Sequence, residues 1–512
     1  MSAFTSILFE GTDNGSGRPA PNAPEFFSDL NLDQIVEAIT SGRDEYDLKP
    51  FFYTRLSSVV AVEHRHDIMR DLEDRDLFHS IKSFSDQMRT MRQQLTASEK
   101  SYYNYQKERW FLDAVEVYCD ATEILLNDLR RLNPASRGLR GFLLFLTQYT
   151  ASDVFTTLRQ ETKKLTAGLS GIRYSLLIRD GSVTVSNYEG ESDFSAEVEA
   201  TFAKFKQGAA KDYLSAYRPS SGMSHVEAAV LELVARLNPH VFLPLLAFCQ
   251  NHKDFAQKAV LAFDREVQFY IAWLEYAETF KRAGLKFCYP LVSDTCKTVS
   301  NREGFDLALA GKVLREDRTV VCNDFALDGQ ERVFVVTGPN QGGKTTFART
   351  FGQLHYLASL GLPVPGTDAR LFLSDRIFTH FERVEDITTL RGKLQDDLVR
   401  IRHILDDSTP DSVIVMNEVF SSTTLKDAVY LSKKVIERIS QRDALCVWVT
   451  FLDELSRFDA KTVSMVAAVA PENPTLRTYK IERRPADGLS YAQAIAAKYG
   501  LTHERIKERM QP

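Results

Sequence analysis

The sequence of 512 residues lacks the features that mark several large protein classes. It has no excess of one charge sign, because 63 Lys and Arg residues stand against 69 Asp and Glu residues and give a net charge of −6. This balance excludes a strongly basic nucleic-acid-binding protein, although a local basic path remains open. Hydrophobic residues make up 44% and charged residues 26% of the chain, which excludes a mostly disordered or collagen-like protein.

The chain also lacks paired cysteines, long apolar runs and an N-terminal targeting segment. Its six cysteines are scattered without a C-x-x-C pair, which is typical of free thiols in a reducing compartment. The longest apolar stretches, such as 141–146 and 241–249, are shorter than the ~20 residues of a membrane helix. Residues 1–24 have no basic flank before an apolar core, unlike a signal peptide. We therefore expect a cytoplasmic protein without membrane contact, and a flexible leader over residues 1–28.

Two regions with different hydrophobic periodicity follow this leader. Residues 29–300 mostly show the spacing of amphipathic helices, which predicts an α-helical region. Within it, residues 172–188 alternate around an Asp-Gly pair, which predicts a small β-hairpin insertion. Residues 301–512 alternate short β-branched runs with helical segments, which predicts an α/β domain with a largely parallel sheet. At about 150 residues per domain, the length allows two to four such units.

Charge is distributed unevenly between these regions. Residues 331–512 carry 25 Lys and Arg and 23 Asp and Glu, so residues 1–330 carry the remaining 38 and 46, a net charge of −8. A DNA contact in the helical region would therefore be confined to a local path. Its candidates are Arg89, Arg92, Arg130, Arg131, Arg137 and Arg140, for which solvated helix faces are the alternative interpretation. His64 and His66 form an H-x-H pair without neighbouring ligands, and we expect surface or helix-cap histidines rather than a metal site.

The most specific motif is a glycine-rich loop that fits G-x-x-x-x-G-K-[ST]. The β-branched run 332–337 leads into it, and a helical segment begins at Thr345. In this context backbone N–H groups point at phosphates, Lys344 reaches the β- and γ-phosphates, and the Thr345 hydroxyl ligates Mg²⁺. We therefore expect a P-loop that holds ATP and Mg²⁺, formed by Gly338, Pro339, Asn340, Gln341, Gly342, Gly343, Lys344, Thr345 and Thr346.

A second strand with polar residues at its end completes such a site. The apolar run 413–416 is followed by Asn417 and Glu418, and sites in α/β proteins lie at the carboxyl ends of strands. Asn417 offers an uncharged carbonyl oxygen next to Mg²⁺, as a Walker B residue, and Glu418 is placed to polarise an attacking water as general base. A strand end capped by polar residues is the alternative interpretation.

Taken together, the motifs between about residues 301 and 509 resemble the ATPase domain of the MutS mismatch-repair family. Residues 337–346 match the T-G-P-N-x-x-G-K-[ST]-T of that family, and residues 375–379 match its Asp-Arg-Ile-Phe-Thr. Its S-Y-[GA] motif is matched by residues 490–492, and the pair Asn323-Asp324 stands before the loop strand as it often does there. The helical region resembles the family's core and lever helices in pattern only, with the hairpin near 172–188 as a reduced clamp.

The resemblance implies a homodimer formed through the ATPase domain. In the family, a signature helix of one subunit faces the γ-phosphate bound to the other. The corresponding segment here is 390–398, where Gly392 stands in place of the usual serine and Lys393 follows it. A Thr/Ser-rich loop after the acidic strand belongs to the dimer interface in this comparison, with Thr423, Thr424 and Asp427 as its residues.

Departures from the family pattern bear on hydrolysis and on mismatch recognition. Asn417 replaces an Asp, Thr450-Phe451 replaces a Thr-His switch, and Val320 stands where an aromatic residue often stacks on adenine. These changes imply weaker Mg²⁺ support and slow or altered hydrolysis by a Mg-dependent ATPase, while ATP binding is retained. No Phe is followed two residues later by Glu, so the Phe-x-Glu wedge of a mismatch-recognition domain is missing.

Two hypotheses for the function follow from these motifs. The first is a MutS-like ATPase that couples nucleotide state and dimerisation to binding of DNA, in mismatch repair or at a recombination-related structure. The alternative is an ATP-gated protein-interaction module with little hydrolysis and no direct mismatch recognition, which the neutral Asn417, Gly392, Phe451 and the acidic helical region favour. An SMC-like ATPase is disfavoured, because the long heptads of a coiled-coil arm are not seen.

Overall fold

The computed structural model describes residues 4–9, 20–192, 223–382, 392–470 and 473–486, together with Glu197, Thr201 and Lys507. The chain forms two compact units. The first, the helical unit, comprises residues 1–5, 74–134 and 139–264. The second, the mixed unit, comprises residues 6–73, 135–138 and 265–512. These units do not follow the single boundary near residue 300 used in the sequence analysis, and the division into 29–300 and 301–512 stays a prediction.

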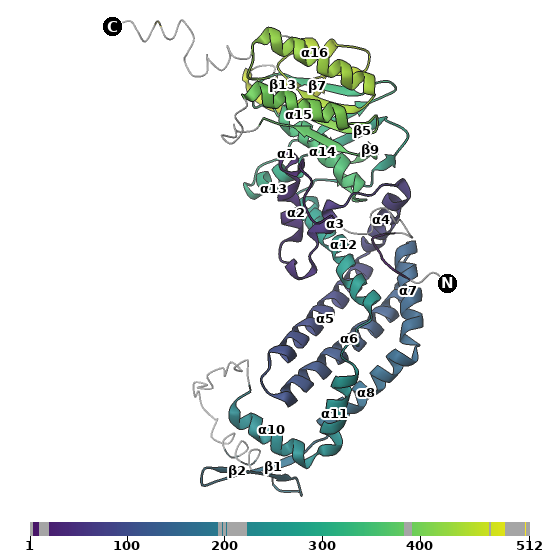
Figure 1. Ribbon diagram of the computed structural model, residues 1–512, viewed down its shortest axis with the longest axis vertical. Coiled ribbons are helices and arrows are strands. Elements are labelled where there is room, and N and C mark those ends of the chain that lie inside the picture. Colours follow the sequence, from purple (N-terminus) through teal and green to yellow (C-terminus); the bar gives the residue numbers. More distant parts are fainter. Residues whose placement is uncertain are drawn as a thin grey trace. The chain divides into compact units, whose positions relative to one another are not determined.

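The helical unit is built mainly from long helices (Figure 1). Its elements are α5 (Arg75–Lys100), α6 (Asn104–Leu132), α7 (Arg137–Thr150, from residue 139), α8 (Asp153–Ser170), β1 (Tyr174–Arg179), β2 (Ser182–Asn187), α10 (His225–Leu237), α11 (Pro239–Asn251) and α12 (Lys258–Arg282, up to residue 264). Helix α5 begins where the Asp74 carboxylate accepts hydrogen bonds from the N–H groups of Asp76 (3.0 Å) and Leu77 (2.9 Å).

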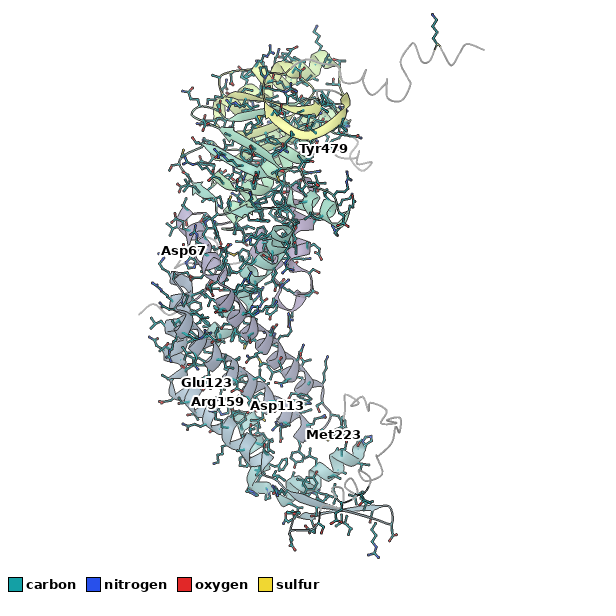
Figure 2. All side chains as sticks on the ribbon, turned by 180° about the vertical axis from the view of Figure 1, so that it is seen from behind. Asp67, Asp113, Glu123, Arg159, Met223 and Tyr479 are labelled. Atoms are coloured by element: carbon teal, nitrogen blue, oxygen red, sulfur yellow. The ribbon has the colours of Figure 1, made fainter. Side chains whose placement is uncertain are left out.

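Helices α5 and α6 pack along their lengths through apolar stripes that repeat every three or four residues. The buried side chains of these stripes are Leu77, Ile81, Phe84, Met88 and Met91 on α5 and Leu112, Val115, Cys119, Leu126 and Leu129 on α6. Polar contacts tie α8 to α6, because Arg159 pairs with Asp120 and lies 3.0 Å from Glu123 (Figure 2). Apart from the predicted hairpin, the described residues between 29 and 282 are therefore mostly helical, as predicted. The end of the predicted helical region is not, because strands lie at 287–288 and 291–293 and another begins at residue 299.

The predicted hairpin is confirmed between α8 and α10. Strands β1 and β2 pair antiparallel, from Tyr174 opposite Asn187 to Arg179 opposite Ser182. The two turn residues, Asp180 and Gly181, both have positive φ (51° and 77°), as a two-residue hairpin turn requires.

The mixed unit joins small N-terminal helices to three sheets (Figure 1). Its helices are α1 (Phe27–Leu30), α2 (Leu32–Thr40), η1 (Asp44–Tyr46), α3 (Lys49–Tyr53), α4 (Val59–Leu72), α12 from residue 265, α13 (Leu307–Arg315), α14 (Lys344–Ser359), α15 (Lys393–Asp407), α16 (Leu425–Arg442) and η2 (Asp453–Arg457). Its strands are β3 (Phe287–Cys288), β4 (Leu291–Ser293), β5 (Val299–Gly304), β6 (Asn323–Leu327), β7 (Val333–Thr337), β8 (Val364–Pro365), β9 (Asp368–Phe372), β10 (Ile377–His380), β11 (Val413–Asn417), β12 (Leu445–Val449), β13 (Thr462–Ala470) and β14 (Asn473–Arg483).

The largest sheet has the strand order β10-β11-β12-β7-β13-β14. All neighbouring pairs are parallel except β13 and β14, which confirms the expected largely parallel sheet. The central strands β7 and β12 are buried along their whole length, because helices cover both faces. Val335 packs in a core with Ile401 of α15 and Ile436 of α16, whereas Phe334 turns its ring toward Phe347 of α14.

An N-terminal segment is attached to the same unit through α14. The Asp29 carbonyl accepts a hydrogen bond from Arg349 Nε (2.8 Å), and the Leu30 carbonyl accepts one from Gln353 Nε2 (2.8 Å). The Tyr356 hydroxyl donates to the Phe52 carbonyl over 2.7 Å. Residues 27–53 therefore belong structurally with the sheet domain, although more than 250 residues separate them from it in sequence.

Two further sequence expectations can be compared with the described residues. His64 and His66 are buried, with 4% and 3% of their surface exposed, so the prediction of surface histidines was wrong. Within the described part of the chain no group of three or more His, Cys, Asp or Glu side chains is arranged to hold a metal ion. In the same residues no single helix is long and apolar enough to cross a membrane, although α10 and α11, bent by 106°, reach that length and composition together.

Candidate functional site

The glycine-rich loop lies between the end of β7 and the start of α14. Three of its residues have positive φ: Gly338 at 111°, Gln341 at 59° and Gly343 at 93°. Gly342 has no room for a side chain, because a Cβ atom there would lie 2.9 Å from both the Ala467 Cβ and the Pro339 carbonyl oxygen. The loop is therefore bent tightly against β13, which turns its backbone toward the helix start.

Lys344, the first residue of α14, is 4% exposed and contacts its own loop. Its Nζ donates to the carbonyl oxygens of Gly338 (2.8 Å) and Pro339 (3.2 Å) and to Asn340 Oδ1 (3.4 Å). The Phe451 ring lies 4.6 Å from the same nitrogen, which is a cation–π contact. Burial lowers the pKa of Lys344, and the nearby carboxylate of Glu418 opposes that effect.

The loop and the end of β11 are joined by one hydrogen bond. The Thr345 hydroxyl donates to Asn417 Oδ1 over 2.9 Å, although 72 positions separate the two residues in the chain. Strand β12 lies between β7 and β11 and pairs in parallel with both. The carboxyl ends of β7 and β11 therefore lie at the same edge of the sheet, which brings Asn417 next to Thr345. The two residues predicted to lie next to Mg²⁺, Thr345 and Asn417, are thus brought together. Asn417 offers an uncharged amide oxygen at this position, where an Asp would offer a charged carboxylate.

Glu418 follows Asn417 in a bent backbone with a φ of 52°. Its N–H donates to the Val449 carbonyl (2.9 Å), which holds the residue at the carboxyl end of the sheet. Burial raises the pKa of Glu418, Lys344 lowers it and Glu382 raises it. A carboxylate with a raised pKa is a better proton acceptor near neutral pH, as a general base requires.

The predicted switch position follows β12. Thr450 is buried and stays tied to the sheet, because its N–H donates to the Val336 carbonyl (3.1 Å) and its hydroxyl accepts from the Leu452 N–H (3.1 Å). Phe451 is 52% exposed and covers Lys344. A phenyl ring has no hydrogen-bond donor for a phosphate, so this position can cover the lysine but cannot donate to a nucleotide.

The predicted signature-like segment is described from Gly392 onward. Gly392 caps α15 in an extended conformation, and among the described residues other than its chain neighbours no atom lies within 4 Å of a Cβ built there. Lys393 pairs with Glu382, the same carboxylate that raises the pKa of Glu418. Within one chain, Lys393 therefore has a local partner, and its role toward a second subunit stays a prediction.

The predicted dimer-interface loop has a structural role within the chain. The Thr424 hydroxyl caps α16 by accepting from the Asp427 N–H (3.3 Å) and donates to the Asp427 carboxylate (2.8 Å). Thr424 and Asp427 are exposed and Thr423 is half-buried. The motif at 490–492 lies outside the described residues.

Sequence reasoning missed residues of β14 that contact the loop. Arg477 Nε donates to the Asn340 carbonyl (3.2 Å), and its charge lowers the pKa of Lys344. Tyr479, labelled in Figure 2, has a φ of 59°, and its carbonyl oxygen lies 3.5 Å from a Cβ built on Gly343. Asn323 accepts from the Ile481 N–H and donates to the Tyr479 carbonyl, so β6 holds this strand in place. Only the earlier Asn323-Asp324 motif signalled that contact.

The side chains in this site fit a magnesium nucleotide. Thr345 and Asn417 offer neighbouring oxygens of the kind Mg²⁺ prefers, and Lys344 lies beside them with its ammonium group directed at loop carbonyls. The backbone at Gly342 lacks space for a Cβ, which is typical of a loop that must wrap around phosphates. Glu418 adds a carboxylate close to the lysine.

A comparison with known protein families agrees with this geometry. Residues 334–511 match the family model MutS domain V, which covers about a third of the chain and includes the loop, Asn417 and Glu418. The match supports membership in the MutS family. MutS domain V is the ATPase domain of MutS-type proteins, so the match points to an ATP-binding role linked to DNA. The helical unit lies outside the matched range.

Proposed function

We propose that this protein is a MutS-like ATPase that binds ATP with Mg²⁺ in the loop between β7 and α14. It couples nucleotide state and dimerisation to binding of DNA, in mismatch repair or at a recombination-related structure. The observation that carries the ATP assignment is the 2.9 Å hydrogen bond between Thr345 and Asn417, next to Lys344 and Glu418. The DNA assignment rests on the match of residues 334–511 to MutS domain V.

The residues of the chain have distinct roles in this proposal. Lys344 leaves the carbonyl oxygens of Gly338 and Pro339 and binds phosphate oxygens, which are stronger acceptors because they are charged. Thr345 and Asn417 hold Mg²⁺, which neutralises phosphate charge when it is bound. Glu418 accepts a proton from the attacking water. Because Asn417 contributes no negative charge, we infer that hydrolysis is slow and sensitive to Mg²⁺ concentration.

The homodimer is part of the proposal and involves exposed segments of the mixed unit. Gly392 caps the start of α15, whose first N–H groups can face an anion from a second subunit. Thr423, Thr424 and Asp427, of which Thr424 and Asp427 are exposed, form the loop that the family resemblance assigns to the interface. Nucleotide binding between subunits would then favour the closed dimer.

The six arginines proposed as a phosphate path all interact within the chain. Arg92 pairs with Asp264, Arg131 lies 3.3 Å from Asp128, Arg130 donates to Thr147, Arg140 donates to the Pro134 carbonyl, and Arg89 and Arg137 also have partners. An exposed pair such as Arg131 and Asp128 is weak and can be exchanged for phosphate contacts, whereas Arg92 is held by the buried carboxylate of Asp264. DNA binding through them is therefore expected to depend steeply on salt concentration.

The alternative function is an ATP-gated protein-interaction module with little hydrolysis. Two observations favour it: Phe451 covers Lys344 at the switch position, and Asn417 leaves the Mg²⁺-associated position uncharged. In that case nucleotide binding alone changes the conformation, and the acidic helical region serves a protein partner. Substantial ATP turnover that Glu418→Gln abolishes would contradict this alternative.

The ATP assignment is tested with Mg-ATP binding to the full chain. Lys344→Ala removes charge-assisted hydrogen bonds of about 1.5–3 kcal/mol, so affinity is expected to fall roughly tenfold to a hundredfold. Lys434→Ala on the exposed face of α16 is the matched control and leaves affinity unchanged. Equal affinity of Lys344→Ala and the unaltered protein would refute the site.

Hydrolysis and DNA binding need separate measurements. Glu418→Gln is expected to retain ATP and to lose about 10²-fold or more of the turnover rate, because a general base contributes about that much. ATPase activity is then compared with and without duplex, mismatched and branched DNA at several salt concentrations. Absence of DNA binding near physiological salt would refute the DNA role and leave the ATP site intact.

A further inference from the structure

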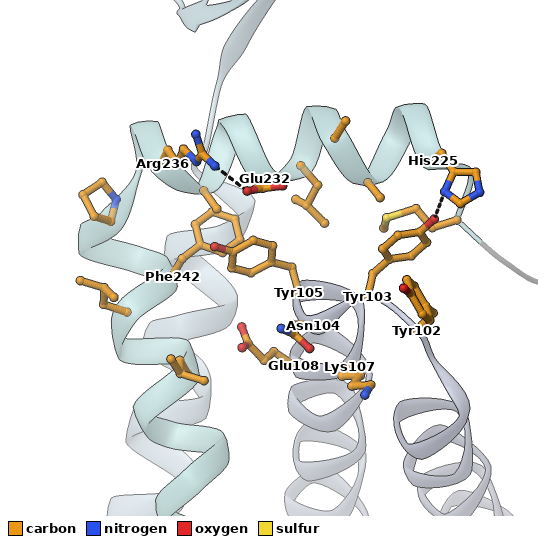
Figure 3. A pocket seen from close by; sticks show the side chains of 18 residues that line it. Tyr102, Tyr103, Asn104, Tyr105, Lys107, Glu108, His225, Glu232, Arg236 and Phe242 are labelled. Atoms are coloured by element: carbon orange, nitrogen blue, oxygen red, sulfur yellow. Dashed lines mark hydrogen bonds and ion pairs between the residues drawn. The ribbon is translucent and has the colours of Figure 1, made fainter.

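A cavity in the helical unit lies apart from the nucleotide site and has a different chemistry. It has a volume of about 1040 Å³ and lies where the start of α6 meets α10 and α11 (Figure 3). All of its lining residues belong to the helical unit. The volume is at the upper end of the range of small-molecule sites, so the cavity can receive a ligand or a protruding side chain.

Aromatic rings form much of the cavity wall. Tyr105 of α6 and Phe242 of α11 meet edge to face, with ring centroids 5.1 Å apart, and Figure 3 shows both rings between the helices. Tyr102 and Tyr103 lie at one end, where the Tyr103 hydroxyl is 2.7 Å from His225 Nδ1. Ring faces carry partial negative charge and attract organic cations.

A buried carboxyl group lies among these rings. Glu108 is 8% exposed, and its Oε2 atom has no hydrogen-bond partner among the described residues. Burial raises the pKa of Glu108 to about 7, because water solvates the charged form less well there. A buried carboxylate without a partner is costly, and natural proteins rarely keep one without a use.

The cations that line the cavity do not neutralise this carboxyl group. Arg236 on α10 pairs with Glu232 at 2.6 Å, as Figure 3 shows. Lys107 lines the cavity from the position before Glu108 on α6. Among the charged residues that line the cavity, Lys107 and Arg236 are balanced by Glu108 and Glu232, so the lining has no excess of positive charge to hold a phosphate-bearing ligand. Aromatic walls with an unpaired carboxylate are instead complementary to a cation with an apolar body.

We propose that this cavity binds an alkylammonium group, with Glu108 as its counterion and the rings of Tyr105 and Phe242 as its walls. The ammonium group can belong to a small amine or to a lysine side chain, free or methylated, of another protein. Both sources share the same chemistry, and neither depends on the nucleotide site. The inference therefore goes beyond the proposed ATPase function and can fail or succeed without it.

The first test compares a cation with its neutral isostere. Choline and 3,3-dimethyl-1-butanol have nearly the same shape, but only choline carries a charge. Titration of the full chain, followed by calorimetry or ligand NMR, is expected to show choline binding about tenfold or more tightly, as a desolvated cation–π contact and an ion pair predict. Equal binding of the two compounds, or no choline binding at 10 mM, would overturn the proposal.

Variants assign the contact to the named residues. Glu108→Gln keeps the size of the side chain and is expected to weaken choline binding about tenfold. Tyr105→Leu removes a ring and is expected to weaken it a few-fold. Glu99→Gln, at an exposed position of α5 outside the cavity, is the control and leaves binding unchanged. If Glu108→Gln binds choline like the unaltered protein, the counterion assignment is wrong.

A third comparison distinguishes the two sources of the cation. A short peptide with one trimethyl-lysine is titrated beside the same peptide with norleucine in its place. Tighter binding of the trimethyl-lysine peptide than of choline supports a protein partner, and tighter binding of choline supports a small amine. Binding of the norleucine peptide as strong as that of the charged peptide would contradict the proposal, because the cavity would then recognise only apolar groups.

Discussion

Replacing Glu108 by Gln should stabilise the helical unit, and the gain should grow with pH. The pKa of this buried carboxyl group is about 7 in the folded chain, against an ordinary value of 4.5. The difference corresponds to about 3 kcal/mol as an upper limit. Because Glu108 also lines an open cavity, water reaches part of the group, and about 1–2 kcal/mol is the more realistic expectation.

The direction of this pH dependence follows from the protonation state of Glu108 that the folded chain prefers. The folded chain holds its proton more tightly than the unfolded chain does, so the stabilisation is present below pH 4.5. It is lost as the pH rises toward 7, where the folded chain must bury a charge or keep a proton that the unfolded chain has released. Gln at position 108 cannot ionise. The variant should therefore differ little from the unaltered protein at pH 5 and be more stable at pH 8.

Hydrogen exchange of the α6 amides measures this difference in stability within the helical unit. Global unfolding is less suitable, because a protein with two units need not unfold in a single two-state transition. At pH 8, exchange in Glu108→Gln is expected to be about five- to thirtyfold slower than in the unaltered protein, and at pH 5 nearly equal. Comparison at one pH cancels the intrinsic effect of pH on exchange. Glu99→Gln is the control. A gain that is the same at both pH values, or a loss at pH 8, would refute the reasoning.

Three further predictions concern the nucleotide site. Asn417→Asp adds a carboxylate next to Thr345, so half-maximal ATPase activity should require roughly tenfold less Mg²⁺, measured by Mg²⁺ titration; an unchanged requirement would show that this position does not limit the metal. Phe451→Ala removes a cation–π contact of about 0.5–1 kcal/mol from Lys344 and should tighten ATP binding about two- to fivefold in equilibrium titrations. Gly342→Ala places a Cβ 2.9 Å from Ala467 and should weaken ATP binding about tenfold. Gly311→Ala on α13, where the new Cβ lies 3.8 Å from the Phe280 ring, should not; equal effects would contradict the tight-loop geometry.

Much of the sheet domain could be predicted because its signals are local. Strands β7, β11 and β12 are short runs of apolar and β-branched residues, and a strand buried on both faces requires such a run wherever it lies in the sheet. The turn at Asp180 and Gly181 was equally predictable, because positive φ at both positions strongly favours these residue types. The burial of His64 and His66 could not be predicted, because it depends on which distant segments pack over them.

The same distinction applies to the candidate site, where residues of a local motif could be predicted and residues from distant elements could not. Gly342, Lys344 and Thr345 form one continuous motif, so their types and spacing were enough to predict a phosphate loop. Arg477 contacts the same loop from β14, but a single arginine in a strand carries no sign of its neighbour. Glu108 is a similar case, because its burial arises only where α6, α10 and α11 meet.

By itself, the sequence determined the helical and α/β regions, the hairpin turn and the residues of the loop, because each depends on a few neighbouring positions. Only the tertiary structure decided that Thr345 meets Asn417, that residues 27–53 pack on α14 and that the Glu108 Oε2 atom, in an aromatic cavity, has no hydrogen-bond partner among the described residues. These contacts join segments tens to hundreds of residues apart. Their geometry follows from the order of strands and the packing of helices, which short-range patterns do not encode.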